Sequence, residues 1–205
     1  MQGTFKSTVV SRATDSFYNQ FSLVYPLVDV FLRPQKKVLC QEVNQLPNGN
    51  LLDIGVGNGA HLRHYKKHSI TGIDTSSAML KIARKRNPAT VQLLEMNGEA
   101  LSFQDEQFDY VVLSHVIAVV DHPEQLLEEV FRVLKPQGKL FILNHFTPHN
   151  WLKHLDQAFG RIAKSFHFRS VFHLHEIRTI RKFTLLKEIR LDALSYFKLF
   201  IYQKK

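Results

Sequence analysis

The stretch Leu51-Leu52-Asp53-Ile54-Gly55-Val56-Gly57-Asn58-Gly59 decides the fold of this 205-residue chain. A short apolar run, typical of a buried strand, leads directly into a glycine-rich turn. Glycine lets the backbone turn sharply and lets a ligand approach without meeting a Cβ atom. The stretch therefore predicts a strand, a tight turn that can hold a ligand, and a helix that begins at Gly59.

Two acids accompany this turn. Asp53 lies two residues before the first glycine of a Gly-x-Gly-x-Gly pattern, whereas a dinucleotide site favours Gly-x-Gly-x-x-Gly. Asp74 ends the next apolar run, 21 residues after Asp53. A carboxylate there can accept hydrogen bonds from both ribose hydroxyls of a nucleoside that lies over the turn. Because both acids stand at the ends of neighbouring expected strands, together they predict a nucleoside site. The alternatives are a glycine turn that holds no ligand and an Asp74 that only caps a helix.

Strands and helices alternate outward from this stretch, which predicts a mostly parallel sheet with helices on both faces. We expect strands over 51–54, 70–73, 91–95, 108–114 and 139–144, and helices over 59–67, 76–86 (with Thr75 or Ser76 as N-cap) and 124–134. Two further strands, 185–191 and 197–203, are separated by only a few residues. So short a gap predicts an antiparallel hairpin, because a parallel crossover needs a dozen residues or more.

The chain contains no internal repeat or obvious linker, so we expect a single domain over 1–205. Residues 12–45 predict a helical cap in two pieces, punctuated by Pro26 and Pro34. The α/β core then occupies 46–205. The single cysteine, Cys40, excludes an intramolecular disulfide. Residues 1–10 have no apolar core of a secretion signal, so we expect a cytoplasmic protein.

Positive charge is concentrated in the last quarter of the chain. Residues 151–205 carry twelve Lys and Arg against four Asp and Glu, which is eight of the nine net charges. Aromatic and basic residues alternate in Phe166-His167-Phe168-Arg169 and around Phe172 and His173. The composition of 161–190 suits a peripheral contact with anionic lipid at the inner membrane face. The alternatives are a solvated surface, or aromatic residues that form core under the last two strands.

Together these motifs resemble the class I methyltransferases that use S-adenosylmethionine (SAM), and the resemblance runs from about Tyr18 to Leu143. It is carried by the glycine turn, Asp74, Asn97-Gly98-Glu99-Ala100-Leu101, Phe108-Asp109-Tyr110-Val111-Val112 and Leu134-Lys135-Pro136-Gln137-Gly138. One departure is Asn97, where relatives usually have Asp. An Asn can accept a hydrogen bond from adenine only through its amide oxygen, without the charge. The resemblance implies a Rossmann-like class I fold that binds SAM and releases S-adenosylhomocysteine.

The resemblance also implies which residues bind the cofactor. SAM carries an ammonium and a sulfonium instead of phosphates, which suits an acid such as Asp53 at the turn. The implied cofactor-binding residues are Tyr18, Asp53, Gly55, Val56, Gly57, Gly59, Asp74, Thr75, Met79, Asn97, Gly98, Glu99 and Ser114. The pattern contains no convincing zinc or magnesium ligand set, so we expect no metal.

The acceptor is suggested by three segments. Residues 114–120 and 143–146 resemble bacterial phosphatidylethanolamine N-methyltransferases, and 18–25 resemble these enzymes and the ubiquinone-pathway C-methyltransferases. The resemblance favours N-methylation of phosphatidylethanolamine at a membrane surface. The alternatives are a soluble small molecule or quinone precursor as acceptor and, more remotely, a non-catalytic nucleic-acid-binding module that uses the basic region. The sequence does not indicate an oligomeric state.

Methyl transfer from a sulfonium is a direct displacement, so the enzyme mainly aligns nucleophile, carbon and sulfur. An amine nucleophile must be neutral, and histidine can take its proton near neutral pH. His115 and His145, at expected strand ends, are the candidates; otherwise they bind the cofactor or shape the pocket wall. Tyr25 and Tyr18 could close the site over a cationic group, or only pack in the core.

Overall fold

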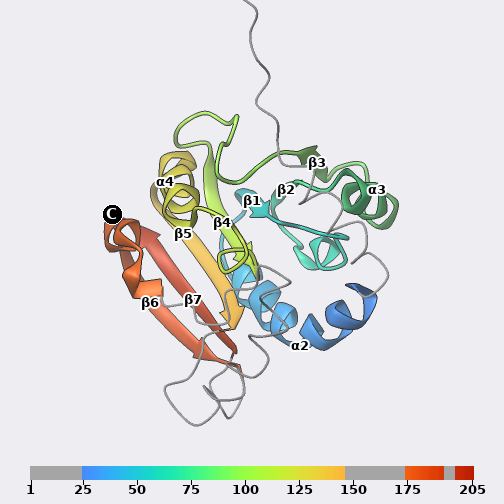
Figure 1. Cartoon of the computed structure of the whole chain (residues 1–205), viewed down its shortest axis with the longest axis horizontal. Helices are drawn as coiled ribbons and strands as arrows, with labels where there is room; N and C mark the ends of the chain where they lie inside the picture. The colour runs from blue at the N-terminus through green and yellow to red at the C-terminus, as the bar shows by residue number, and fades with distance from the viewer. Residues whose placement is uncertain (1–24, 146–173, 192–196) are drawn as a thin grey trace, which may run out of the picture.

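The computed structural model describes residues 25–145, 174–191 and 197–205. Their strands form one seven-stranded sheet in the order β3-β2-β1-β4-β5-β7-β6 (Figure 1). The strands are β1 (Asn50–Ile54), β2 (Ser69–Asp74), β3 (Gln92–Glu95), β4 (Phe108–Ser114), β5 (Leu134–His145), β6 (Phe183–Arg190) and β7 (Phe197–Lys204). Strands β1 to β5 run parallel, whereas β7 is antiparallel to both β5 and β6. The predicted parallel sheet with a C-terminal antiparallel hairpin is confirmed.

Helices cover both faces of this sheet, as the alternating pattern predicted. They are α2 (Tyr25–Asn44), α3 (Ser77–Arg86), α4 (Pro123–Val133) and the 3-10 turns η1 (Leu62–His64), η3 (Leu174–Glu176) and η4 (Arg178–Lys182). One core cluster joins α4 and η4 to the sheet, and a second joins α2, η1 and α3 to the opposite face. This is the Rossmann-like arrangement of class I methyltransferases.

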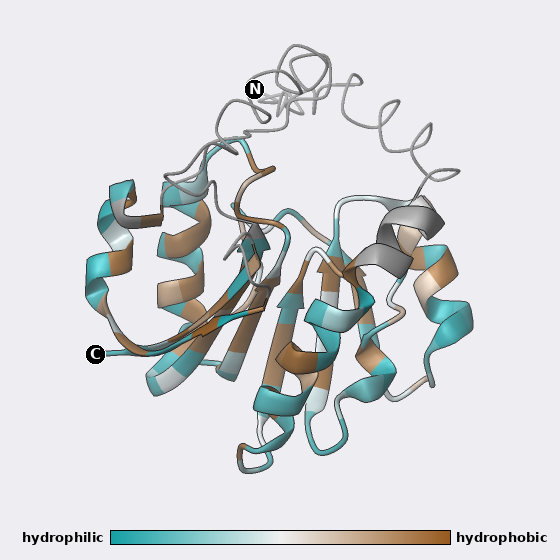
Figure 2. Cartoon of the chain, turned by 90° about the horizontal axis from the view of Figure 1, so that it is seen from below, coloured by the Kyte–Doolittle hydropathy of each residue, from teal (hydrophilic) through white to brown (hydrophobic). Residues whose placement is uncertain are grey.

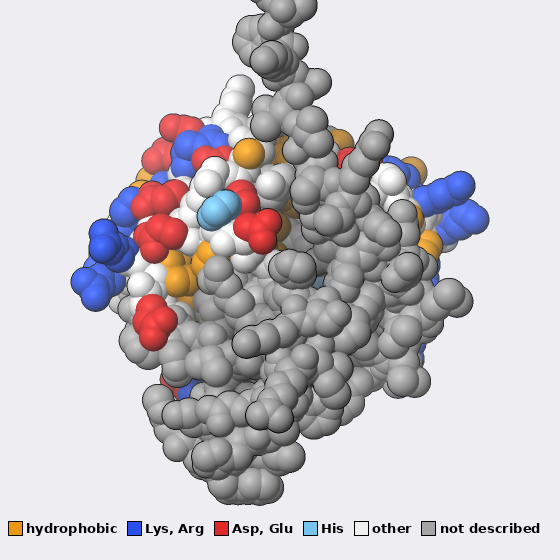
Figure 3. Space-filling model, viewed as in Figure 1, with side chains coloured by type: hydrophobic (Ala, Val, Ile, Leu, Met, Phe, Trp, Pro, Cys, Tyr) orange, Lys and Arg blue, Asp and Glu red, His pale blue; other side chains and the backbone are white. Residues whose placement is uncertain are grey.

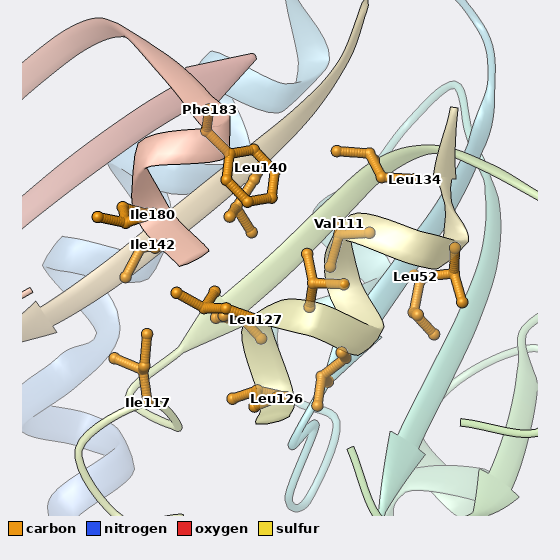
Figure 4. Packing of buried hydrophobic residues seen from close by; sticks show 14 of the residues in the cluster. Leu52, Val111, Ile117, Leu126, Leu127, Leu134, Leu140, Ile142, Ile180 and Phe183 are labelled. Atoms are coloured by element: carbon orange, nitrogen blue, oxygen red, sulfur yellow. The ribbon is translucent and has the colours of Figure 1, made fainter. Parts of the chain in front are cut away.

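Strand β4 lies between the two clusters. Val111 and Leu113 belong to the α4 cluster, whereas Tyr110 and Val112 belong to the α2 cluster. This alternation explains why 108–114 is an almost continuous apolar run. Figure 4 shows Leu126 and Leu127 of α4 in the same buried cluster as Ile180 of η4 and Phe183 of β6. In Figure 2 the hydropathy colours follow the same logic, with apolar strands at the centre and polar helix surfaces outside.

Two expectations about helices are wrong. The helix expected over 59–67 is only the short turn η1. Gly59 adopts a left-handed φ of 65°, and its carbonyl accepts from both Leu62 N–H and the amide of Asn87, so no α-helix starts there. The expected break at Pro34 is also absent, because α2 continues from Tyr25 to Asn44. Pro34 lies inside α2 and is exposed.

Candidate functional site

The glycine turn connects β1 to η1 and is fastened to the end of β2. Gly55 N–H and Val56 N–H both donate to the carbonyl of Ile73, at 2.8 and 3.0 Å. Gly55 has a left-handed φ of 75°, and a Cβ atom there would collide with Cγ2 of Val116. A side chain at Gly55 would therefore strain the backbone and displace the loop after β4. The turn forms a cradle that only glycine allows.

Asp74, the last residue of β2, holds the other side of this cradle. Its Oδ2 accepts from Gly57 N–H at 2.7 Å, and its Oδ1 accepts from Ser76 N–H at 2.9 Å. Burial raises the pKa of Asp74, while these two N–H groups act in the opposite direction. The N–H of Thr75 acts in the same direction as these two groups. A carboxylate offers about four lone-pair sites, so room remains for a ligand hydroxyl. The ribose contact of Asp74 stays a prediction.

Asp53 lies beneath the turn and is fully buried. Its Oδ2 accepts from the Tyr65 hydroxyl at 3.0 Å and lies 2.8 Å from His61 Nε2. Its Oδ1 has no hydrogen-bond partner among the residues that the structure describes. A buried carboxylate oxygen without a donor favours a cationic or hydrogen-bonding ligand. This is the feature that the ammonium of SAM would satisfy.

His61 and Tyr65 were missed by the sequence reasoning. Both are buried, and both contact the same oxygen of Asp53. Burial, followed by the charge of Asp53, raises the pKa of Tyr65 well above its ordinary value, so its hydroxyl remains a donor. The signal was present, since two polar rings follow Asp53 by eight and twelve residues, but the expected helix gave no reason to turn them toward the strand.

The loop after β3 was predicted to bracket adenine. Asn97 Oδ1 accepts from Glu99 N–H at 2.9 Å, which leaves one lone pair on that oxygen. Glu99 Oε1 accepts from His122 N–H at 2.8 Å, just before α4 begins. A Cβ atom on Gly98 would lie 2.8 Å from Ile54 Cγ2, so the loop packs directly on the end of β1. Asn97 itself is exposed.

Ser114 and His115 lie at the carboxyl end of β4. Ser114 is buried, and its Oγ has no hydrogen-bond partner among the described residues. His115 has a left-handed φ of 61°, and its N–H donates to the Leu143 carbonyl at 2.7 Å. Its ring lies edge-on to Phe197, with the centroids 5.9 Å apart. The backbone of His145 pairs with Phe197, so both candidate histidines belong to one corner of the sheet.

The remaining predicted residues fall into two groups. Ser76 is the N-cap of α3, because its Oγ accepts from Met79 N–H at 3.3 Å; Met79 is buried and Thr75 is exposed. Tyr25 is the first residue of α2 and His145 the last of β5, but their side chains lie outside what the structure describes. Tyr18 and 161–173 also lie outside the described residues.

These groups fit SAM. The glycine turn, the carboxylate of Asp74 and the unpartnered oxygen of Asp53 all lie at the carboxyl ends of the neighbouring strands β1 and β2. In open α/β sheets, ligands bind at this edge of the strands. Among the described residues, no group of three or more His, Cys, Asp or Glu could hold a metal ion.

Figure 3 shows acidic side chains grouped on the part of the surface near α4, with Lys and Arg at its rim. Glu124 and Glu128 of α4 are exposed, and Glu128 contacts Lys182 of η4 at 2.6 Å. This surface pairs charges of both signs and does not form a one-sign patch. No helix within 25–145, 174–191 and 197–205 is long and apolar enough to cross a bilayer.

Comparison with known proteins agrees with this geometry. Residues 52–142 match the model of a methyltransferase domain. A phosphatidylethanolamine N-methyltransferase of Cereibacter sphaeroides is 28% identical over 165 residues, which cover 77% of this chain and 81% of that protein. A ubiquinone/menaquinone biosynthesis C-methyltransferase of Geotalea daltonii is 32% identical over 134 residues, and the match spans 60% of this chain and 57% of that enzyme.

A solved structure from Thermotoga maritima, described as a SAM-dependent methyltransferase and possible histamine N-methyltransferase, superposes with a TM-score of 0.71. It is 24% identical, and the match covers 93% of this chain and 99% of that one. This structural likeness supports only the fold, whereas the methyltransferase-domain match and the similar proteins support the family. The glycine cradle, its two acids and these likenesses lead to one conclusion: the chain is a class I SAM-dependent methyltransferase.

Proposed function

We propose that this methyltransferase N-methylates phosphatidylethanolamine at a membrane surface. The observation that carries the proposal is the phosphatidylethanolamine N-methyltransferase relative, because its match extends over 81% of that enzyme. The excess of Lys and Arg in 151–205 supports it, since a cationic surface attracts anionic lipid. The methyltransferase domain leaves the non-catalytic nucleic-acid module without support.

In this proposal the chain holds SAM and orients the acceptor amine. SAM supplies an already activated methyl group when bound. Asp74 accepts the ribose hydroxyls, Asp53 receives the ammonium, and the loop at Asn97, Gly98 and Glu99 borders the adenine. Alignment of the reacting atoms then accounts for most of the acceleration.

His115 is our candidate for the proton that the acceptor amine must lose. It follows β4 directly, its N–H is bound to the Leu143 carbonyl, and its ring lies against Phe197. These contacts hold His115 at the carboxyl end of β4, which supports the proposal that it lies beside the transferred methyl group. His145 is the second candidate, and Tyr25 and Tyr18 are proposed to close the site.

Methylation of a quinone precursor is the alternative, because several quinone-pathway C-methyltransferases are 30 to 34% identical. The chain spans only 49% of the Renibacterium salmoninarum demethylmenaquinone enzyme and 44% of the Ectopseudomonas mendocina enzyme. Across these enzymes the match reaches at most 63% of their length, in the Wigglesworthia glossinidia enzyme, against 81% for the phosphatidylethanolamine relative. Their higher identity favours the quinone alternative, and the longer match supports the first proposal.

One assay separates the two acceptors. Purified protein is incubated with methyl-labelled SAM and vesicles of phosphatidylethanolamine and phosphatidylglycerol, or with a dihydroxybenzoquinone precursor bearing a polyprenyl chain. We expect a labelled lipid that migrates as mono- or dimethylated phosphatidylethanolamine. Label in the quinone product alone would replace the first proposal with the alternative.

A further inference from the structure

A buried amide without partners lies at the carboxyl end of β5. Asn144 is fully buried, and neither its Oδ1 nor its Nδ2 has a hydrogen-bond partner within the described ranges. Burial of an amide without hydrogen bonds is unfavourable, so folded proteins pair such groups with protein, water or a ligand. A leucine at this position would avoid that cost. The amide therefore lowers the stability of the fold unless a group outside the described residues satisfies it.

The surroundings of Asn144 associate it with the reacting corner of the sheet. The carbonyl of the preceding residue, Leu143, accepts a hydrogen bond from the N–H of His115. The following residue, His145, pairs with Phe197, and the ring of His115 lies against the ring of Phe197. The backbone of Asn144 therefore lies between the two positions that contact His115, while strand alternation places its side chain on the α4 face of the sheet, with Leu140 and Ile142. Strand β5 is the second strand from β1, about 10 Å away. Strand β2, which ends at Asp74, is one strand farther, about 14 Å from β5. Asn144 is thus separated from both Asp53 and Asp74.

We propose that Asn144 hydrogen-bonds the polar group of the methyl acceptor, an inference that rests on the proposed function. Its Nδ2 can donate to a phosphate-ester or carbonyl oxygen, and its Oδ1 can accept from an amine or hydroxyl. A headgroup that carries both a donor and an acceptor satisfies both atoms at once. A site built to hydrogen-bond such a group discriminates strongly against analogues that lack it. Asn144 is therefore a specificity-determining residue, distinct from those that bind SAM.

The first test compares Asn144→Leu with a matched control, Thr179→Val. Thr179 is also a buried polar residue, but it contacts Glu124 and Glu128 of α4 and not the strand ends. We expect Asn144→Leu to raise the KM for vesicle phosphatidylethanolamine at least about 10-fold, with SAM affinity by calorimetry changed less than twofold. Thr179→Val should leave both values unchanged while it lowers the unfolding temperature. An unchanged KM in Asn144→Leu means that the amide only binds buried water, and overturns the proposal.

A second test does not require turnover or a folded variant. The side-chain amide of Asn144 in the wild-type protein with S-adenosylhomocysteine is followed by ¹⁵N NMR during addition of glycerophosphoethanolamine or a soluble dihydroxybenzene. A saturable shift with either probe supports the inference, and the probe that causes it identifies the acceptor chemistry. If phosphatidylethanolamine is not methylated but the dihydroxybenzene shifts the amide, the proposed function fails and the role of Asn144 stands. If neither probe shifts the Asn144 amide signal, the proposed role of Asn144 is overturned.

Discussion

At the scale of single residues, the buried carboxylate of Asp53 depends on few donors. Its Oδ2 is contacted by Tyr65 and His61, while Oδ1 has no donor among the described residues. Loss of one donor from a buried charged group leaves a desolvation cost that nothing offsets. The polar cluster of Asp53, His61 and Tyr65 therefore supports the glycine turn from below.

We expect Tyr65→Phe to lower the free energy of unfolding by about 1–3 kcal/mol, because Asp53 loses a hydroxyl donor in a buried site. The matched control is Tyr110→Phe, which removes a hydroxyl that donates to the neutral carbonyl of Pro47 at 3.1 Å. Urea unfolding at pH 7 measures both variants. A smaller loss for Tyr65→Phe than for Tyr110→Phe would contradict this assignment.

Asp74 connects the turn to the start of α3 and is our ribose-binding residue. Asp74→Ala should weaken SAM binding at least about 100-fold, since hydrogen bonds to a charged group contribute about 1.5–3 kcal/mol each. The protein should remain folded, as measured by circular dichroism. Asp109→Ala serves as the control, because Asp109 binds Asn50 N–H and Lys135 at the other end of the sheet. SAM affinity by calorimetry should be unchanged in Asp109→Ala, and an unchanged affinity in Asp74→Ala would remove the ribose contact.

At the scale of elements, the order of strands and helices was predictable from local pattern. The apolar run over 108–114 and the short gap before 197 indicated a buried parallel strand and an antiparallel hairpin, and both are present. The absence of an α-helix after the glycine turn was not predictable in the same way. Its absence depends on a tertiary hydrogen bond from Asn87 to the Gly59 carbonyl, 28 residues apart. Local propensity does not contain that information.

The contact between α4 and η4 was also invisible in the sequence, because it joins residues more than 50 positions apart. Thr179 donates its N–H and hydroxyl to Glu124, and Lys182 donates to Glu128 at 2.6 Å. The Thr179 hydroxyl is the main cause that lowers the pKa of Glu124, and the hydrogen bond from Lys182 is the main cause for Glu128. Both carboxylates are thus more acidic in the folded state than in the unfolded chain.

This contact predicts acid sensitivity. A carboxylate with a lowered folded-state pKa contributes its full stability above its ordinary pKa of 4.5, and loses it as the pH falls through the lower folded value. We expect the urea midpoint of the wild type to fall below pH 4.5 more steeply than that of a Glu124→Gln, Glu128→Gln double variant. Glu176→Gln, a change at an exposed glutamate of η3, is the control. Parallel curves for the wild type and the double variant would refute the contact's role.

At the scale of the whole molecule, the cofactor half of the site was accessible from sequence and the acceptor half was not. The cradle and its acids use glycine spacing and strand ends, which are local and regular features. The proposed acceptor corner combines Asn144 of β5, Phe197 of β7 and His115, which follows β4, and these come together only through the pairing of β5 with its neighbours. The contacts of His61 and Tyr65 with Asp53 likewise could not be predicted from the sequence, because they depend on the short turn η1 that replaces the expected helix.

The last feature at this scale is the edge of the sheet. Leu185 and Leu186 of the edge strand β6 are 48% and 47% exposed, unusual for adjacent leucines, and they lie where β6 shifts register against β7. Lys182 and Lys187 flank them in sequence, within the part of 161–190 that the structure describes, and each is ion-paired, with Glu128 and Glu42 respectively. Adjacent apolar and cationic side chains suit the headgroup region of an anionic bilayer.

We therefore expect the protein to float with phosphatidylglycerol-rich vesicles at low salt and to remain in solution with phosphatidylcholine vesicles. Each Lys or Arg near an anionic surface contributes about 1 kcal/mol, and about 1 M salt shortens the Debye length to roughly 3 Å, so binding should be lost there. A Leu185→Ser, Leu186→Ser variant should bind several-fold more weakly at low salt, whereas Ile82→Ser, which alters another exposed apolar residue on α3, should not. Equal flotation of both variants would mean that charge alone holds the protein at the membrane, and no flotation of the wild type at low salt would remove the membrane contact.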